Sequence, residues 1–103
     1  MESVDGNISC GIAIPQVFTE DPIYLDLIRK FAIRAEDLGF DSLWVQERII
    51  GTADSLEPLT LLSYLAASTK SIRLGTAVII ATTRNPFLLA KELCTIDNLS
   101  KGR

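Results

Sequence analysis

Three strand-like runs recur along the chain, the first of them apolar without polar alternation, and a stretch with helical spacing of apolar residues follows each of them. The runs cover residues 8–14, 41–46 and 72–80, and the helical stretches cover residues 22–38, 56–69 and 86–99. Continuous apolar runs of this length are typical of strands covered on both faces, as in parallel sheets. The pattern therefore predicts three consecutive strand–helix units of an α/β fold.

Local signals mark the ends of the predicted helices. Asp21-Pro22 and Asn85-Pro86 each combine a side chain that can cap a helix with a proline in the first turn, where a missing N–H is tolerated. Ser55 can cap the middle helix in the same way. Gly39 is placed to close the first helix in the left-handed conformation.

The three predicted strands begin roughly 30 residues apart, which is the size of one unit in a parallel barrel that closes with eight units and about 250 residues. With 103 residues, the chain is expected to form one α/β domain (1–103), the N-terminal three βα units of a (β/α)8 TIM barrel, incomplete as given. A fourth strand is expected just past Arg103. A complete small βα domain of another kind is the less favoured alternative, because nothing terminates the sheet after Arg103.

Composition narrows the class of protein. The chain is 48% hydrophobic and 22% charged, with a net charge of −3, which is typical of a globular protein and argues against nucleic-acid or membrane partners. No apolar stretch reaches the roughly 20 residues of a membrane span, and no secretory signal is present. Cys10 and Cys94 lack a metal or redox spacing, so we expect reduced packing residues in a cytoplasmic protein. No histidine is available as a general base.

In parallel βα arrays, ligands bind beyond the carboxyl ends of the strands, because the loops that follow the strands converge there. This rule places residues 15–18, 46–51 and 76–84 at the predicted site. No Gly-rich phosphate loop is present.

Several motifs in register carry a resemblance to a known family. They are Ala35–Glu47, Glu57-Pro58-Leu59, Ile72–Val78, Arg84-Asn85-Pro86 and Asp97–Arg103. In this order they resemble landmarks in the N-terminal part of the bacterial luciferase-like monooxygenase superfamily, over about residues 8–103. Within that superfamily the chain most resembles the coenzyme F420-dependent oxidoreductases, with FMN-dependent monooxygenases as near relatives.

The resemblance implies a (β/α)8 barrel that holds coenzyme F420 or reduced FMN at its C-terminal mouth, with no metal. It further implies that the cofactor ring rests against the end of the third strand, at Thr76, Ala77 and Val78. Family members often carry a cis non-proline bond there, so the resemblance implies one at about Ala77–Val78. The alternative is an ordinary strand end, with Thr76 in a structural role.

The resemblance also singles out residues on the substrate side. Many relatives place a histidine directly after the position of Glu47, where this chain has Arg48. Arginine stays charged and cannot shuttle protons, but it can anchor an anionic substrate or stabilise negative charge on the ring. The alternative for Arg48 is a surface ion pair with Glu47. Glu47 is a candidate proton donor if it is buried, because burial raises the pKa of a carboxyl group.

Gln16 and Trp44 complete the predicted substrate side. Trp44 has an alternative role as a core anchor. The resemblance therefore implies an oxidoreductase or monooxygenase for a small organic substrate, and we expect it to be inactive without the rest of the barrel. The competing hypothesis is a non-catalytic piece that persists by self-association, as a homo-oligomer, or by pairing with the remaining barrel segments, because three strands alone leave two unpaired sheet edges.

Overall fold

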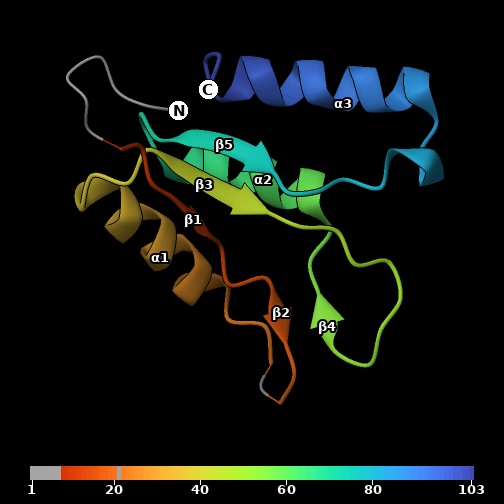
Figure 1. The fold of residues 1–103 in the computed structure, drawn as a ribbon, viewed down its shortest axis with the longest axis horizontal. Coiled ribbons are helices and arrows are strands. Elements are labelled where there is room, and N and C mark those ends of the chain that lie inside the picture. The colour runs from red at the N-terminus through yellow and green to blue at the C-terminus, as the bar shows by residue number, and fades with distance from the viewer. Residues whose placement is uncertain (1–7, 21) are drawn as a thin grey trace.

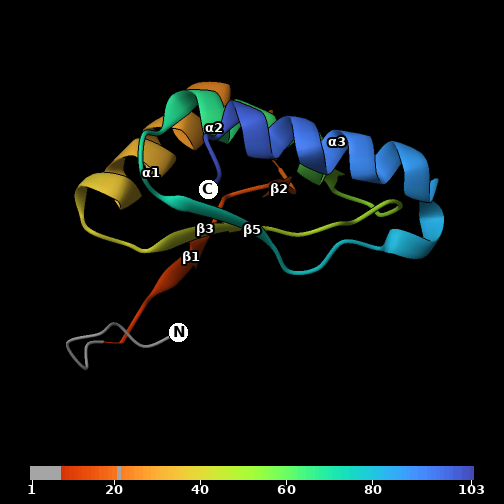
Figure 2. The ribbon, with the colours of Figure 1, turned by 90° about the horizontal axis from the view of Figure 1, so that it is seen from above.

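The computed structural model describes residues 8–20 and 22–103, and its architecture is α/β. Strands β1 (Gly11–Ala13), β3 (Ser42–Val45) and β5 (Arg73–Thr76) form a parallel sheet in the order β1-β3-β5. Helices α1 (Leu25–Asp37), α2 (Pro58–Ser68) and α3 (Pro86–Leu99) follow these strands in turn. Figures 1 and 2 show all three helices on the same side of the sheet. Within the described residues, no helix has the length and apolar character needed to cross a bilayer.

The core lies between the sheet and the helix layer. In β3, Leu43 and Val45 are buried toward the helices, whereas Trp44 between them is 39% exposed on the opposite face. The core residues come from all three helices and the segments around the strands: Ile14, Ile28, Ala32, Ala35, Leu59, Leu61, Leu62, Leu65, Ile72 and Ile96. The apolar runs predicted strands covered on both faces, but the described elements cover only the helix side (Figure 2).

The strands are shorter than the apolar runs that predicted them. β1 occupies only residues 11–13 of the predicted 8–14, and β5 ends at Thr76 rather than at residue 80. After β5 the Ala77 N–H still donates to the Val45 carbonyl at 2.7 Å, and the chain then leaves the sheet toward a 3₁₀ turn, η1 (Ala81–Thr83). The peptide bond between Ala77 and Val78 is cis, as the resemblance implied, so the alternative of an ordinary strand end is wrong.

The residues that cap the helices can be compared with the caps that the sequence predicted. Asn85 caps α3 as predicted, accepting hydrogen bonds from the N–H groups of Phe87 and Leu88. The predicted cap Ser55 is wrong: Glu57 caps α2, accepting from Leu59 at 3.1 Å and Thr60 at 2.7 Å. Pro58 takes the first helical position and holds the preceding residue extended, so the cap must be the residue directly before it.

The first helix begins later than expected, at Leu25 rather than residue 22, because Tyr24 is still extended. Asp21, its predicted cap, lies outside the described residues. Gly39 has a φ of +87° just beyond the end of α1, which confirms its left-handed role. Cys10 and Cys94 are free and exposed, so the expectation that both pack in the interior is wrong for the described chain.

Two charged side chains secure the end of the fold where the strands begin. Glu36 on α1 accepts hydrogen bonds from the backbone N–H groups of residues 70–72, which connect α2 to β5. Burial alone would raise the pKa of Glu36, but these donors outweigh it and lower the pKa. Arg103 donates to the Ala66 and Thr69 carbonyls at the end of α2, as cations favour helix C-termini. Its own carbonyl accepts from the Leu74 N–H at 3.1 Å, beside β5.

Candidate functional site

The loops that follow β1 and β3 are joined to each other at the carboxyl end of the sheet. β2 (Val17–Phe18) and β4 (Asp54–Ser55) form a two-stranded antiparallel sheet, with Val17 opposite Ser55 and Phe18 opposite Asp54. The sequence analysis did not predict this pairing, because two residues are too few to show an alternating pattern. The paired strands form one rim of the predicted site (Figure 1).

The side chain of Gln16 connects the backbone segments next to β2 and β4. Its side-chain amide donates to the carbonyls of Gln46 at 2.5 Å and Leu56 at 2.8 Å, and its carbonyl oxygen accepts from the Gln46 N–H at 2.8 Å. Gln16 is only 3% exposed. Because its polar atoms bind three backbone groups, the contacts favour a structural role, and the predicted role in substrate binding gains no support from them.

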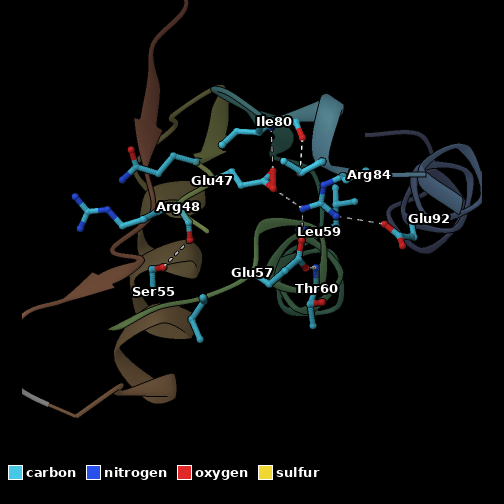
Figure 3. Close-up of polar contacts among 12 residues, drawn as sticks. Glu47, Arg48, Ser55, Glu57, Leu59, Thr60, Ile80, Arg84 and Glu92 are labelled. Atoms are coloured by element: carbon cyan, nitrogen blue, oxygen red, sulfur yellow. Dashed lines mark hydrogen bonds and ion pairs between the residues drawn. The ribbon is translucent and has the colours of Figure 1, made fainter. Parts of the chain in front are cut away.

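Glu47 lies just beyond β3 and is buried, with a side chain 5% exposed. One carboxylate oxygen accepts from the Ile80 N–H and the other from Arg84, both at 3.0 Å. The alternative of an ion pair between Arg48 and Glu47 is wrong, because Glu47 pairs with Arg84. Figure 3 shows the Arg48 side chain directed away from Glu47. Arg48 is exposed, and its carbonyl accepts from the Ser55 hydroxyl at 3.2 Å.

Arg84 links three segments of the site (Figure 3). Besides Glu47, its guanidinium contacts Glu57 at 2.7 Å and Glu92 of α3 at 3.7 Å. The hydrogen bond with Glu57 raises the pKa of Arg84. Sequence reasoning placed Arg84 in a family motif but gave it no role, and no local signal identifies carboxylates 27 and 37 residues away as its partners.

The pKa of Glu57 is lowered from 4.5 to about 2. Burial acts in the opposite direction, but it is outweighed by hydrogen bonds from Thr60, Arg84 and the Leu59 N–H. Glu57 thus neutralises Arg84 and caps α2 at the same time.

Stability should therefore depend on the ionisation of Glu57. Its pKa is lower in the folded state, so its contribution is complete above pH 4.5 and is lost as the pH falls toward 2. Because the side chain is 46% exposed, we expect an effect of under about 1 kcal/mol. Urea denaturation of wild type and Glu57→Gln should show a free-energy difference that shrinks over this window. A difference that stays constant from pH 7 to pH 2 would contradict the assignment.

The three predicted cofactor-contacting residues differ in their settings. Thr76 is partly buried and lies opposite Val45 in the sheet register, so its side chain points to the helix side. This position favours the structural alternative for Thr76. Ala77 and Val78 lie beyond the end of β5 and are exposed, Val78 by 71%. Their predicted contact with a cofactor ring stays a prediction.

The indole of Trp44 lies across the uncovered face of the sheet. Its Nε1 donates to the Ser42 hydroxyl at 2.8 Å. A Cβ added to Gly75 on β5 would lie 2.6 Å from Trp44 Cζ3, and one added to Gly11 on β1 would meet the Nε1 side of the ring. The two glycines therefore leave room for the ring to lie flat over all three strands. This placement makes Trp44 an exposed aromatic surface rather than a core anchor.

Gly75→Ala should displace the indole and lower the free energy of unfolding by about 1–3 kcal/mol, as overpacking does. In a Trp44→Ala background the same substitution should be nearly neutral, because the three atoms nearest to the added methyl group all belong to the Trp44 ring. A double-mutant cycle measured by urea denaturation checks this coupling. Equal losses in both backgrounds would show that the ring does not constrain Gly75.

A family model described as luciferase-like monooxygenase matches residues 8–103. The chain belongs to the luciferase-like monooxygenase family. It is 36% identical over 83 residues to an F420-dependent glucose-6-phosphate dehydrogenase from Kineococcus radiotolerans, a match that covers 74% of this chain and 24% of the relative. It is 31% identical over 90 residues to an alkanal monooxygenase alpha chain from Photorhabdus luminescens, covering 86% of this chain and 25% of the relative.

Two solved structures of monooxygenases share the fold. A monooxygenase from Streptomyces bottropensis superposes with a TM-score of 0.80 at 25% identity, covering 93% of this chain and 31% of that chain. The oxygenating constituent of 3,6-diketocamphane monooxygenase from Pseudomonas putida, in complex with FMN, gives 0.82 at 20% identity, covering 93% and 28%. This luciferase-like chain thus spans about a quarter of the length of the curated relatives it matches.

The candidate site has exposed aromatic and apolar surfaces of the kind that bind a planar organic ring. Trp44 presents an aromatic face, and Ala77 and Val78 present small exposed apolar groups beyond the strand end. Among residues 8–20 and 22–103, no group of three or more His, Cys, Asp or Glu could hold a metal ion. The exposed side chains of Trp44, Ala77 and Val78 fit the apolar face of an organic ring.

Proposed function

We propose that the chain supplies the first three βα units of a (β/α)8 oxidoreductase that uses coenzyme F420 or FMN on a small organic substrate. The observation that carries this proposal is the ledge formed by residues 77–80, which follows β5 at the carboxyl end of the sheet and on which Ala77 and Val78 are exposed. Ligands of parallel βα folds bind at this end. Relatives named for F420-dependent and monooxygenase activities support the cofactor class.

Within this proposal, Ala77 and Val78 would hold one face of the cofactor ring, with Thr76 fixing the strand below them. Trp44 would bound the substrate side with its exposed indole. Arg48 would attract an anionic group of the substrate, because its guanidinium is exposed and does not pair with Glu47. When bound, the cofactor would supply hydride transfer in the F420 case or oxygen activation in the case of reduced FMN.

The test is an absorbance titration of FMN and of F420 into the product of the complete reading frame that encodes this chain. We expect one of the two cofactors to bind saturably. A Val78→Asp variant, which places a charge on the ledge, should weaken that binding, whereas Leu38→Asp at the exposed end of α1, where the strands begin, should leave it unchanged. Absence of binding by both cofactors would refute the proposal.

We propose, as a second candidate, that the 103 residues alone are non-catalytic and self-associate or pair with complementary barrel segments. Large apolar side chains that are at least 50% exposed favour it: Ile8, Tyr24, Leu25, Leu38, Ile49, Ile50, Val78, Phe87, Leu88 and Leu99. Light scattering on the 103-residue chain should then detect oligomers or require a partner segment. A monodisperse monomer that melts cooperatively would contradict this candidate.

A cytoplasmic location belongs to the same proposal. The exposed thiols of Cys10 and Cys94 are unpaired, as is usual in a reducing compartment.

A further inference from the structure

We propose that Glu47 and Arg84 are positioning residues that hold residues 77–80 as a cofactor ledge, and that Glu47 is not a proton donor. This inference rests on the proposed function and assigns a role within the same site. It starts from the two ends of the ledge. At one end, the Ala77 N–H donates to the Val45 carbonyl at 2.7 Å; at the other, the Ile80 N–H donates to the Glu47 carboxylate at 3.0 Å.

Both anchoring groups belong to the segment at the end of β3, since Val45 ends that strand and Glu47 follows two residues later. The ledge is therefore attached to β3 by its first and last N–H groups. Between these attachments Val78 remains 71% exposed, so the ledge is held without being covered. This is the arrangement that a preformed ligand surface requires.

The contacts of Glu47 also argue against proton donation. Each carboxylate oxygen already accepts a hydrogen bond, one from Ile80 and one from Arg84. A protonated Glu47 would turn one acceptor into a donor that faces another donor. The Glu47 side chain is 5% exposed, and its second oxygen is held by the Arg84 guanidinium at 3.0 Å, so neither oxygen is left to face a substrate.

Arg84 extends the attachment to the helix layer. Its Nη2 group lies between Glu47 and Glu57, at 3.0 Å and 2.7 Å, and Glu57 caps α2. The ledge is thereby fixed to β3 and to the first turn of α2. Substitution of Glu47 or Arg84 should therefore shift the ledge, although neither side chain contacts the reacting atoms.

The test compares Glu47→Gln with a matched control, Glu36→Gln, in the product of the complete reading frame. Both carboxylates accept backbone N–H groups of a loop, but Glu36 lies at the opposite end of the sheet and holds residues 70–72. The amide that Glu47→Gln introduces has a single oxygen, so it cannot replace both acceptors that Ile80 and Arg84 use. We expect faster hydrogen–deuterium exchange in peptides covering 77–84, a cofactor Kd weakened about tenfold and an altered absorption band of the bound cofactor.

Glu36→Gln should lower the melting temperature and speed exchange at residues 70–72, with the Kd and the absorption band unchanged. If Glu47→Gln does not fold, Arg84→Lys replaces it, because the shorter lysine side chain does not bring its ammonium to the position where Nη2 contacts both Glu47 and Glu57. This variant should show the same changes at reduced size. The result expected is therefore a loosened ledge and a weaker complex in the same variant.

Three outcomes would overturn the proposal. If hydrogen–deuterium exchange and the cofactor Kd of Glu47→Gln both equal the wild-type values, Glu47 and Arg84 do not hold residues 77–80 in place. A weaker Kd with unchanged exchange would assign Glu47 a direct ligand contact, and faster exchange with an unchanged Kd would remove the ledge from the cofactor site. If the wild type binds neither FMN nor F420, the proposed function fails, and the exchange measurement still decides whether Glu47 and Arg84 hold residues 77–80.

Discussion

Gln16→Glu should lower the free energy of unfolding at pH 7 by about 3–5 kcal/mol, although the two side chains have nearly the same shape. The amide of Gln16 donates to the carbonyls of Gln46 and Leu56. A carboxylate at this buried position would face both carbonyls with no proton to donate. The rim formed by β2 and β4 should loosen, since Gln16 connects the loops on either side of it.

The effect should depend on pH in a defined direction. Burial would raise the pKa of the introduced carboxyl above its unfolded value of roughly 4.3, so the destabilisation should be small below that pH and grow as the pH rises. Gln16→Met, the matched control, should lose about 1–3 kcal/mol without this pH dependence. Urea denaturation between pH 3 and pH 8 measures both variants. A pH-independent difference between them would show that position 16 is solvated.

Arg84→Met should lower the free energy of unfolding by about 3–5 kcal/mol, because it leaves the Glu47 carboxylate buried without its cation. Methionine keeps much of the apolar stem of arginine, so the loss reports the guanidinium contacts rather than an empty space. Glu57 should tolerate the change better, since its side chain is 46% exposed and it keeps the N–H groups of Leu59 and Thr60.

Removing the uncompensated charge should restore much of this stability. The double variant Arg84→Met with Glu47→Gln is expected to recover at least half of the loss, because the buried side chain is then neutral. Glu92→Gln serves as the control: its contact with Arg84 is 3.7 Å and its side chain is 35% exposed, so its loss should stay under about 1 kcal/mol. Chemical denaturation of all four proteins checks these values. A single Arg84→Met variant as stable as wild type would rule out a structural ion pair.

Local signals in the sequence worked where one or two neighbouring residues decide the backbone conformation. Asn85-Pro86 correctly predicted the start of α3, and Gly39 the left-handed residue after α1. Ser55 failed as a cap because Pro58, three residues later, fixes the first helical position and makes Glu57 its cap. The position of Pro58, and not the capping preference of Ser55, therefore decides which residue caps α2.

Apolar patterns were less reliable at strand ends. The run 72–80 continues past β5, because Ile79 packs against the core after the chain has left the sheet. Apolar character reports burial, whereas a strand is defined by its hydrogen bonds. Cys10 was also expected to pack inside, but it lies just before β1 and is exposed.

The sequence by itself determined the α/β class, the positions of the main helices and the resemblance to the luciferase-like monooxygenases, because these depend on local periodicity, caps and short motifs. Only the tertiary structure decided which groups meet at the site. Gln16 binds backbone groups 30 and 40 residues away, and Glu47 pairs with an arginine 37 residues away. Such pairs form where loops converge beyond the strand ends, and no backbone preference of neighbouring residues extends that far.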